Sequence, residues 1–126
     1  MELLLDKIAI VTGGANGIGK ATVRKFVAEG AKVAIWDLND SAGNELQAEL
    51  AAGGAEVIYK HVDTTRPEEI AIAVADVKSK FGNIDILINN AGITRDATLL
   101  KMTDEQWQTV IDVNLTGVFN CIKAVS

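Results

Sequence analysis

The amino-acid sequence predicts an α/β fold in which a doubly wound parallel sheet of four strands carries helices on both faces. Short apolar runs such as Lys7-Ile8-Ala9-Ile10-Val11 alternate with longer segments whose apolar residues recur every three or four positions. The connections are short, which favours parallel strands joined by right-handed helical crossovers. Apolar residues make up 48% of the chain, as expected when strands are covered on both faces.

The alternation places four strands and four helices along the chain. Strands are expected over residues 7–12, 32–37, 56–62 and 84–88. Helices are expected over residues 18–29, 41–52, 66–81 and 103–125. Glycine favours the left-handed conformation that ends many helices, and it follows each of the first three, at Gly30, Gly53-Gly54 and Gly82.

Two helix starts and the buried helix faces can also be predicted. Capping boxes are expected from Thr65 to Glu68, beside Pro67, and from Thr103 to Gln106. Apolar spacing indicates which residues face inward. They are Ile18, Ala21, Thr22 and Phe26; Leu46 and Leu50; Ile70, Val74, Val77 and Phe81; and Trp107, Ile111, Leu115, Val118 and Ile122. Val110, Val113 and Phe119 widen the last apolar surface, so we expect that helix to be covered on more than one side.

A glycine-rich segment, Thr12-Gly-Gly-Ala-Asn-Gly-Ile-Gly19, joins the first strand to the first helix. Backbone N–H groups in such a turn, together with the helix N-terminus, can bind a phosphate at close range. The alternative is a purely structural turn. A phosphate loop after the first strand predicts that this strand is central, in the order 3-2-1-4. A flavodoxin-like order, 2-1-3-4, uses the same elements, and the hydrophobic pattern does not separate the two.

Composition limits the classes of function. The chain of 126 residues is expected to be one domain, and its net charge of −5 argues against a nucleic-acid surface. No apolar run approaches membrane-spanning length. The single cysteine, Cys121, is expected to be buried and inert, which fits a reducing cytoplasm. No metal site is expected.

Several motifs together resemble the short-chain dehydrogenase/reductase family. The glycines follow the pattern G-x-x-x-G-x-G, and Asn89-Asn90-Ala91-Gly92 follows the fourth strand. The acids Asp37 and Asp63, at the ends of the second and third strands, and Asn114 in the last helix complete the likeness. The resemblance covers essentially the whole chain but only the N-terminal half of a family member. It implies a Rossmann-like domain over residues 1–126, truncated before strand five.

The resemblance implies a site for a nicotinamide dinucleotide. The cofactor-binding residues would be Thr12, Gly13, Asn16, Gly17, Ile18, Gly19, Asp37, Leu38, Asp63, Thr64, Asn89, Asn90, Ala91 and Gly92. The N–H groups around Gly17 would hold the pyrophosphate, and the Asp63-Thr64 pair would read the adenine. Asn89, Ala91 and Gly92 would line the floor under the ribose and nicotinamide.

Asp37 lies about 20 residues beyond the glycines, where a carboxylate accepts hydrogen bonds from the adenosine ribose hydroxyls. It also repels a 2′-phosphate, so NAD is expected rather than NADP. The absence of arginine or lysine at Asn16 and Leu38 agrees. Each polar motif also has a structural interpretation. Asp37 could be a helix-flanking acid, Asp63 a turn acid, and Asn89-Asn90 a polar strand-end turn.

Asn114 is a polar residue in an apolar helix, where asparagine is unfavourable. The resemblance implies that it bends the helix and helps to hold a proton-relay water; a satisfied structural asparagine is the alternative. His61 is interpreted as a packing or surface residue. Trp36 and Trp107 are interpreted as core or interface residues rather than ligand platforms.

The family's hydride transfer needs a tyrosine acid/base, a lysine four residues later and a serine. The only tyrosine is Tyr59, and Asp63 stands four residues later. Ser126 ends the last expected helix and is not expected to be the catalytic serine. We therefore expect a cofactor-binding half that is inactive alone. The parent reaction would be reduction of a carbonyl or its reverse. The segment 93–103 looks most like 3-oxoacyl carrier-protein and acetoacetyl-CoA reductases, so a 3-oxoacyl thioester is the expected substrate.

A second hypothesis is a non-catalytic, self-associating α/β module. Without a fifth strand, the edge of strand 84–88 and the helix 103–125 would expose apolar surface, which predicts a homo-oligomer. A third is a flavodoxin-like phosphate-binding domain. Asp37 argues against it, because a flavin phosphate gains nothing from an acid at that distance.

Overall fold

The computed structural model describes residues 2–91 and 103–126. The strands are β1 (Ile8–Thr12), β2 (Lys32–Asp37), β3 (Val57–His61) and β4 (Ile86–Asn89). The helices are α1 (Gly17–Ala28), α2 (Asp40–Ala52), α3 (Pro67–Lys80), α4 (Asp104–Ile111), the π-helical turn η1 (Asp112–Thr116) and α5 (Gly117–Val125). The expected boundaries therefore agree with the observed ones to within one or two residues.

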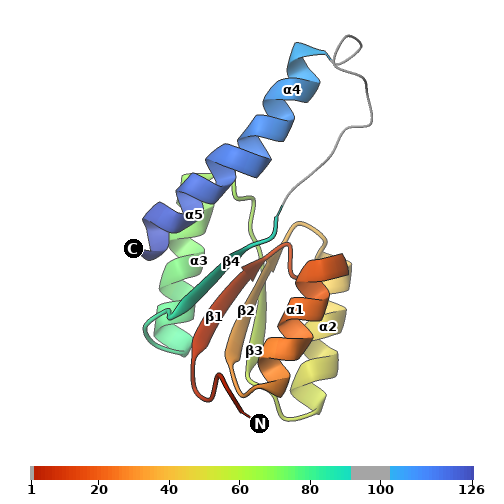
Figure 1. The fold of residues 1–126 in the computed structure, drawn as a ribbon, viewed down its shortest axis with the longest axis vertical. Coiled ribbons are helices and arrows are strands. Elements are labelled where there is room, and N and C mark those ends of the chain that lie inside the picture. Colours follow the sequence, from red (N-terminus) through yellow and green to blue (C-terminus); the bar gives the residue numbers. More distant parts are fainter. Residues whose placement is uncertain (1, 92–102) are drawn as a thin grey trace.

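The four strands form one parallel sheet in the order β3-β2-β1-β4. The predicted order 3-2-1-4 is confirmed, and the flavodoxin-like order is wrong. Helices α1 and α2 cover one face, and α3 and α5 cover the other (Figure 1). Every residue of β1 is buried, as expected for the central strand of a sheet covered on both sides.

Each face of the sheet has its own apolar core. Towards α1 and α2, Val11, Val33 and Ile35 pack with Val23 and Leu46. Towards α3 and α5, the alternate residues of the same strands pack against the helices. The core on this side includes Ile8, Ile10, Ala34, Trp36, Val62, Ile70, Ala73, Val74, Val77 and Cys121. The predicted inward stripe of α3 and the burial of Cys121 and Trp36 are confirmed.

The predicted inward face of α1 is confirmed at Phe26, which packs against the core on this side of the sheet, but it is wrong at Ile18. Ile18 is 79% exposed, whereas Gly19 and Val23 are the buried residues. The turn before α1 brings Gly19 against the carbonyl of Gly13, so Gly19 must face inward and Ile18 is rotated away from the sheet. The close approach of the turn, rather than apolar spacing, therefore sets the orientation of this helix.

The start of α3 also differs from the prediction. Arg66 is the N-cap residue, and its side chain makes no capping hydrogen bond. Thr65 therefore lies one residue before the N-cap, outside the position that a capping box with Glu68 requires, and its hydroxyl donates to the Asp63 carboxylate at 2.6 Å. The second predicted box is confirmed, with reciprocal bonds between Thr103 and Gln106.

The last helix is divided by η1, and Figure 1 shows the rod formed by α4 and α5 projecting beyond the sheet. The predicted inward residues Leu115 and Ile122 are 63% and 49% exposed, while Gly117 and Cys121 are buried. A π-helical turn holds an additional residue, which rotates the face of the following helix by about 100°. The side chains of Trp107, Val110 and Val113 lie outside the described residues.

None of the helices in the described part of the chain is both long enough and apolar enough to cross a membrane.

Candidate functional site

A cavity of about 360 Å³ opens at the carboxyl edge of the sheet. This edge is where nucleotides bind in open parallel sheets, at the point where strand order reverses. Its lining comes from the ends of all four strands and from the turn before α1. The residues are Gly13, Asn16, Gly17, Trp36, Asp37, Leu38, Val62, Asp63, Thr64, Asn90 and Ala91.

The glycine turn is shaped by close backbone approach. Gly13 has a φ of +64° and Gly17 a φ of +56°, both in the left-handed region that favours glycine. A Cβ on Gly19 would collide with the carbonyl oxygen of Gly13 and with Nδ2 of Asn90. A Cβ on Gly17 would meet nothing within 4 Å, so the backbone there faces open space. The turn is therefore tightly packed at Gly19 and open to solvent at Gly17.

The N-terminus of α1 lies directly at this opening. Its N-cap residue, Asn16, makes no side-chain capping bond, and the first turn holds no acidic residue. By contrast, α2 is capped by Asn39, whose side chain accepts from the N–H of Ala42 at 3.0 Å. The N-terminal amides of a helix attract anions unless a side chain already satisfies them. The start of α1 is therefore suited to an external anion.

The Thr12 hydroxyl joins the two strand ends beneath the cavity. Its oxygen accepts from the N–H groups of Asn90 at 3.0 Å and Ala91 at 2.9 Å, and it contacts the carbonyl of Ile88 at 3.3 Å as a donor. The Asn90 amide also donates to the carbonyl of Gly13 at 3.1 Å. These bonds hold the segment after β4 against the glycine turn.

Asp37, the last residue of β2, accepts three backbone hydrogen bonds through its carboxylate. Oδ2 accepts from the N–H of Ala15 at 3.0 Å, and Oδ1 accepts from the N–H groups of Leu38 at 2.7 Å and Asn39 at 3.1 Å. A carboxylate offers about four lone-pair positions, so three donors leave room for roughly one more. Asp37 can therefore accept a hydrogen bond from one ligand hydroxyl without losing a present one.

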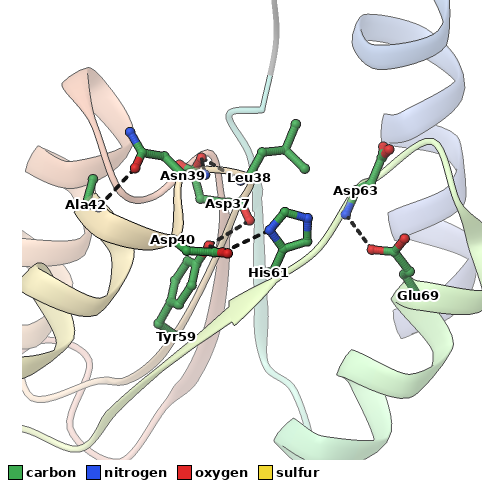
Figure 2. Close-up of polar contacts among 9 residues, drawn as sticks. All are labelled: Asp37, Leu38, Asn39, Asp40, Ala42, Tyr59, His61, Asp63 and Glu69. Atoms are coloured by element: carbon green, nitrogen blue, oxygen red, sulfur yellow. Dashed lines mark hydrogen bonds and ion pairs between the residues drawn. The ribbon is translucent and has the colours of Figure 1, made fainter.

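Asp63 and Thr64 form the opposite wall. Burial works against ionisation of Asp63, but hydrogen bonds from Thr65 and the nearby Arg66 outweigh it, and its pKa is held below the ordinary value. The N–H of Asp63 donates to Glu69 at 3.1 Å (Figure 2). These contacts tie the loop to α3 and keep the carboxylate ionised.

Helix α5 also fixes this wall. The Asn120 amide donates to the carbonyl of Thr64 at 3.1 Å. A Cβ on Gly117 would come within 2.7 Å of the Thr64 hydroxyl, so only glycine allows the helix to approach this closely. The position of Thr64 therefore depends on α5.

Beside the cavity, a polar cluster links β2, α2 and β3 (Figure 2). The Tyr59 hydroxyl lies 2.6 Å from Oδ1 of Asp40 and 3.0 Å from the carbonyl of Asp37. Nδ1 of His61 lies 2.9 Å from the same Asp40 oxygen. Burial and the hydrogen bond to Asp40 raise the pKa of Tyr59, whereas hydrogen bonds from Tyr59 and His61 lower the pKa of Asp40.

The structure brings together most of the predicted site residues. Thr12 and Gly19 are buried behind the lining, Ile18 and Asn89 are exposed, and Asn114 lies in η1 with an exposed side chain. Gly92 lies outside the described residues. Sequence reasoning missed Trp36 and Val62, each of which precedes a predicted acid. Because strand side chains alternate between faces, these neighbours line the other side of the same opening. No cluster of potential metal ligands occurs in residues 2–91 and 103–126.

Comparison with known proteins identifies the family. The chain belongs to the short-chain dehydrogenase family, whose profile matches residues 7–126. It is 45% identical over its whole length to a 3-oxoacyl-[acyl-carrier-protein] reductase of Synechocystis and 44% identical over 97% of its length to a 3-alpha-(or 20-beta)-hydroxysteroid dehydrogenase of Mycobacterium bovis. It covers 51% and 46% of these two proteins, so it spans about half the length of the curated relatives it matches.

Solved structures agree with this assignment. A short chain dehydrogenase from Mycobacterium smegmatis superposes with a TM-score of 0.93 at 35% identity, over 98% of this chain and 52% of that one. A putative short-chain dehydrogenase from Novosphingobium aromaticivorans gives a TM-score of 0.92 at 33% identity, over 99% of this chain and 46% of that one. The family is one of oxidoreductases that use nicotinamide dinucleotide cofactors.

Proposed function

We propose that this chain is the cofactor-binding half of a short-chain dehydrogenase and that it prefers NAD to NADP. The supporting observation is one cavity that combines the glycine turn, the carboxylate of Asp37 and the Asp63-Thr64 wall. A dinucleotide needs these three features together, for its pyrophosphate, its ribose and its base.

The residues present fit a dinucleotide. The pyrophosphate would lie against the N–H groups of Asn16, Gly17 and Ile18, where the backbone faces open space and α1 lacks a side-chain cap. Thr12 and Gly19 would support this turn from behind. Asn90 and Ala91 line the part of the cavity beside β4, where the floor under the second ribose would lie. In the proposal Asn89 and Gly92 extend that floor.

The preference for NAD rests on charge. The carboxylate of Asp37 would accept a ribose hydroxyl as a donor, but it would repel a phosphate at the same ribose. Leu38, the next lining residue, offers no positive charge to offset this repulsion. In the same proposal, the N–H of Thr64 and the carboxylate of Asp63 recognise the adenine edge.

When bound, the nicotinamide supplies the hydride for carbonyl reduction. This chain would contribute Asn114, from the π-helical turn, to a proton relay. π-helical turns inside α-helices occur frequently at functional sites. Tyr59 is unsuited to the acid/base role, because its hydroxyl lies against Asp40 and its pKa is raised rather than lowered.

The parent reaction in this proposal is reduction of a 3-oxoacyl thioester or the reverse oxidation. The support is similarity to the Synechocystis reductase and to the 3-oxoacyl-[acyl-carrier-protein] reductase FabG of Chlamydia muridarum, which is 40% identical over 98% of this chain. The expected tyrosine, lysine and serine are not among the motifs of these 126 residues. We therefore propose that the chain alone binds cofactor without turnover.

The test is titration of the purified chain with NADH and NADPH, followed by fluorescence. We expect saturable binding that favours NADH and a weaker preference in Asp37→Ala. Asp76→Ala is the matched control, because it removes an exposed carboxylate on α3 that does not line the cavity. Absence of saturable NADH binding would refute the proposal. An unchanged preference in Asp37→Ala would refute the role of Asp37.

Self-association is a second proposed property. Leu115, Phe119 and Ile122 lie on one stripe of the last helix and are 63%, 60% and 49% exposed. In the described part of the chain, β4 pairs only with β1 and leaves one strand edge open. Exposed apolar stripes and open edges both favour association. A species that remains monomeric by light scattering at high concentration would overturn this proposal.

A further inference from the structure

His61 occupies a position beside the ribose wall that the cofactor motifs do not include. It is the last residue of β3 and pairs in register with Asp37, the last residue of β2. Residues paired in adjacent strands share a face of the sheet, and adjacent strands lie about 4.8 Å apart. The His61 side chain is 49% exposed, so its ring is open to solvent at this rim.

One carboxylate contacts this ring, and two more belong to residues beside it in the sheet or along the chain. Asp40, at the start of α2, contacts Nδ1 directly, and Asp37 is the register partner on β2. Asp63, two residues further along the chain, interacts electrostatically with the ring and also pairs with Arg66 at 3.6 Å. Figure 2 shows the ring between the Asp40 side of the cluster and Asp63. Within the described residues, Tyr59 is a further titratable neighbour, and its hydroxyl contacts the same Asp40 oxygen.

The position of Asp40 is fixed independently of His61. The Tyr59 hydroxyl donates to Asp40, and the N–H of Tyr59 donates to the Gln47 side chain of α2 at 2.5 Å. Gly43 lets the Tyr59 ring lie against α2, where a Cβ would collide with it. Loss of the His61 ring therefore leaves the start of α2 docked on β3.

We propose that His61 is a specificity-determining residue whose protonation weakens the discrimination against a cofactor that carries a 2′-phosphate. This inference rests on the proposed function, which places the adenosine ribose at Asp37. Histidine side chains change charge between about pH 5 and 8. While the ring is neutral, His61 does not offset the negative charges of Asp37 and Asp40 at this rim. The imidazolium adds one positive charge among them, which lowers the repulsion of a phosphate and hardly affects an uncharged hydroxyl.

The experiment measures the dissociation constants of NADP⁺ and NAD⁺ by calorimetry at pH 8.5 and pH 6.0, in buffer of low ionic strength to limit screening. For the unmodified chain, the ratio of the NADP⁺ constant to the NAD⁺ constant should fall as the pH falls. A phosphate ester takes up its own proton near pH 6, so part of that fall belongs to the ligand. His61→Gln measures this part. We expect the ratio of the two constants to fall about fivefold less in this variant than in the unmodified chain, the order of effect of one nearby charge.

Two further variants sharpen the result. His61→Lys provides a fixed positive charge, so its ratio should already be low at pH 8.5. Lys60→Gln is the matched control, since Lys60 is adjacent in β3 but pairs with Asp76 on α3, and it should keep the pH dependence of the unmodified chain. Equal pH dependence in the unmodified chain and His61→Gln, with NAD⁺ still bound, would overturn this inference alone. Failure to bind NAD⁺ at either pH would overturn the proposed function and this inference with it.

Discussion

The backbone N–H of Ala15 donates to Oδ2 of Asp37 at 3.0 Å, across 22 positions of sequence. Ala15 belongs to the glycine turn and Asp37 ends the neighbouring strand, so one hydrogen bond joins the two walls of the cavity. The N–H of Gly13 adds a second link, because it donates to the carbonyl of Trp36 at 2.7 Å. In the proposed function, the groups that bind pyrophosphate and ribose therefore form one rigid unit before any ligand arrives, which reduces the entropy lost on binding.

Replacement of Gly19 by alanine should destabilise the chain strongly. The new Cβ would collide with backbone at Gly13 and with the Asn90 amide, and neither can move without opening the turn. We expect a loss of about 2–3 kcal/mol in the free energy of unfolding, measured in urea. Gly17→Ala is the matched control: its Cβ meets open space, so it should lose only about 1 kcal/mol from its left-handed backbone. Equal losses would contradict the packing argument.

Thr12→Val should lower both stability and NADH affinity. The methyl group cannot accept the N–H groups of Asn90 and Ala91, so two donors lose their partner. Unmade hydrogen bonds of this kind cost about 1–3 kcal/mol each, and the solvent near the cavity reduces the loss, so we expect about 2 kcal/mol in urea denaturation. Thr12→Ser retains the hydroxyl and should stay within about 1 kcal/mol of the unmodified chain. A valine variant as stable as the serine variant would contradict the proposed role of the hydroxyl.

The free energy of unfolding should fall in acid, partly through Asp63. Its pKa is lowered in the folded chain, so the unfolded chain binds a proton more readily. The contribution of Asp63 is fully present above the ordinary aspartate pKa and is lost as the pH falls through the lower folded value. Thr65→Val removes one hydrogen bond to the carboxylate. Urea denaturation between pH 6 and pH 3 should therefore show a shallower decline for this variant. Parallel curves would exclude a contribution from this bond.

Cys121 should resist alkylation in the folded chain. Burial raises the pKa of its thiol to about 11, and the thiolate is the reactive form. At pH 8 we expect labelling by iodoacetamide to be at least about tenfold slower than in urea, where the thiol is exposed with an ordinary pKa. Equal rates with and without urea would show that the contact between α5 and the sheet opens readily.

Much of the fold can be predicted from the sequence, because several independent sequence signals indicate the same arrangement. Strand runs, glycine stops and the phosphate turn all indicate the sheet order that is observed. Errors arise where a tertiary contact overrides a local pattern. Gly19 rotates α1 so that Ile18 faces solvent. The π-helical turn, which contains Leu115, rotates α5 so that Ile122 is exposed as well. Neither the close approach nor the additional residue in the turn leaves a signal in apolar spacing.

In the candidate site too, some features can be predicted from the sequence and others depend on tertiary contacts. The position of Asp37 at a strand end can be predicted from spacing. Its three backbone donors cannot, because the bond from Ala15 depends on how two loops from distant parts of the chain meet. Likewise, Asn120 looks like an ordinary polar residue in a helix, and only the packed structure shows its bond to Thr64. The alternation of side chains in strands could have identified Trp36 and Val62 as lining residues.

The pairing of β1 with β4 has a consequence for how the chain acquires its site. The bond from the N–H of Ile8 to Asp85 at the start of this pair spans 77 positions, and the cavity wall at Asn90 and Ala91 directly follows β4 at the other end of the pair. Closing so long a loop is entropically costly, and pairings of this kind tend to form late during folding. Competence to bind nucleotide should therefore appear only in the last step of folding. A bound cofactor would then stabilise the folded state by mass action and would leave partly folded forms unaffected.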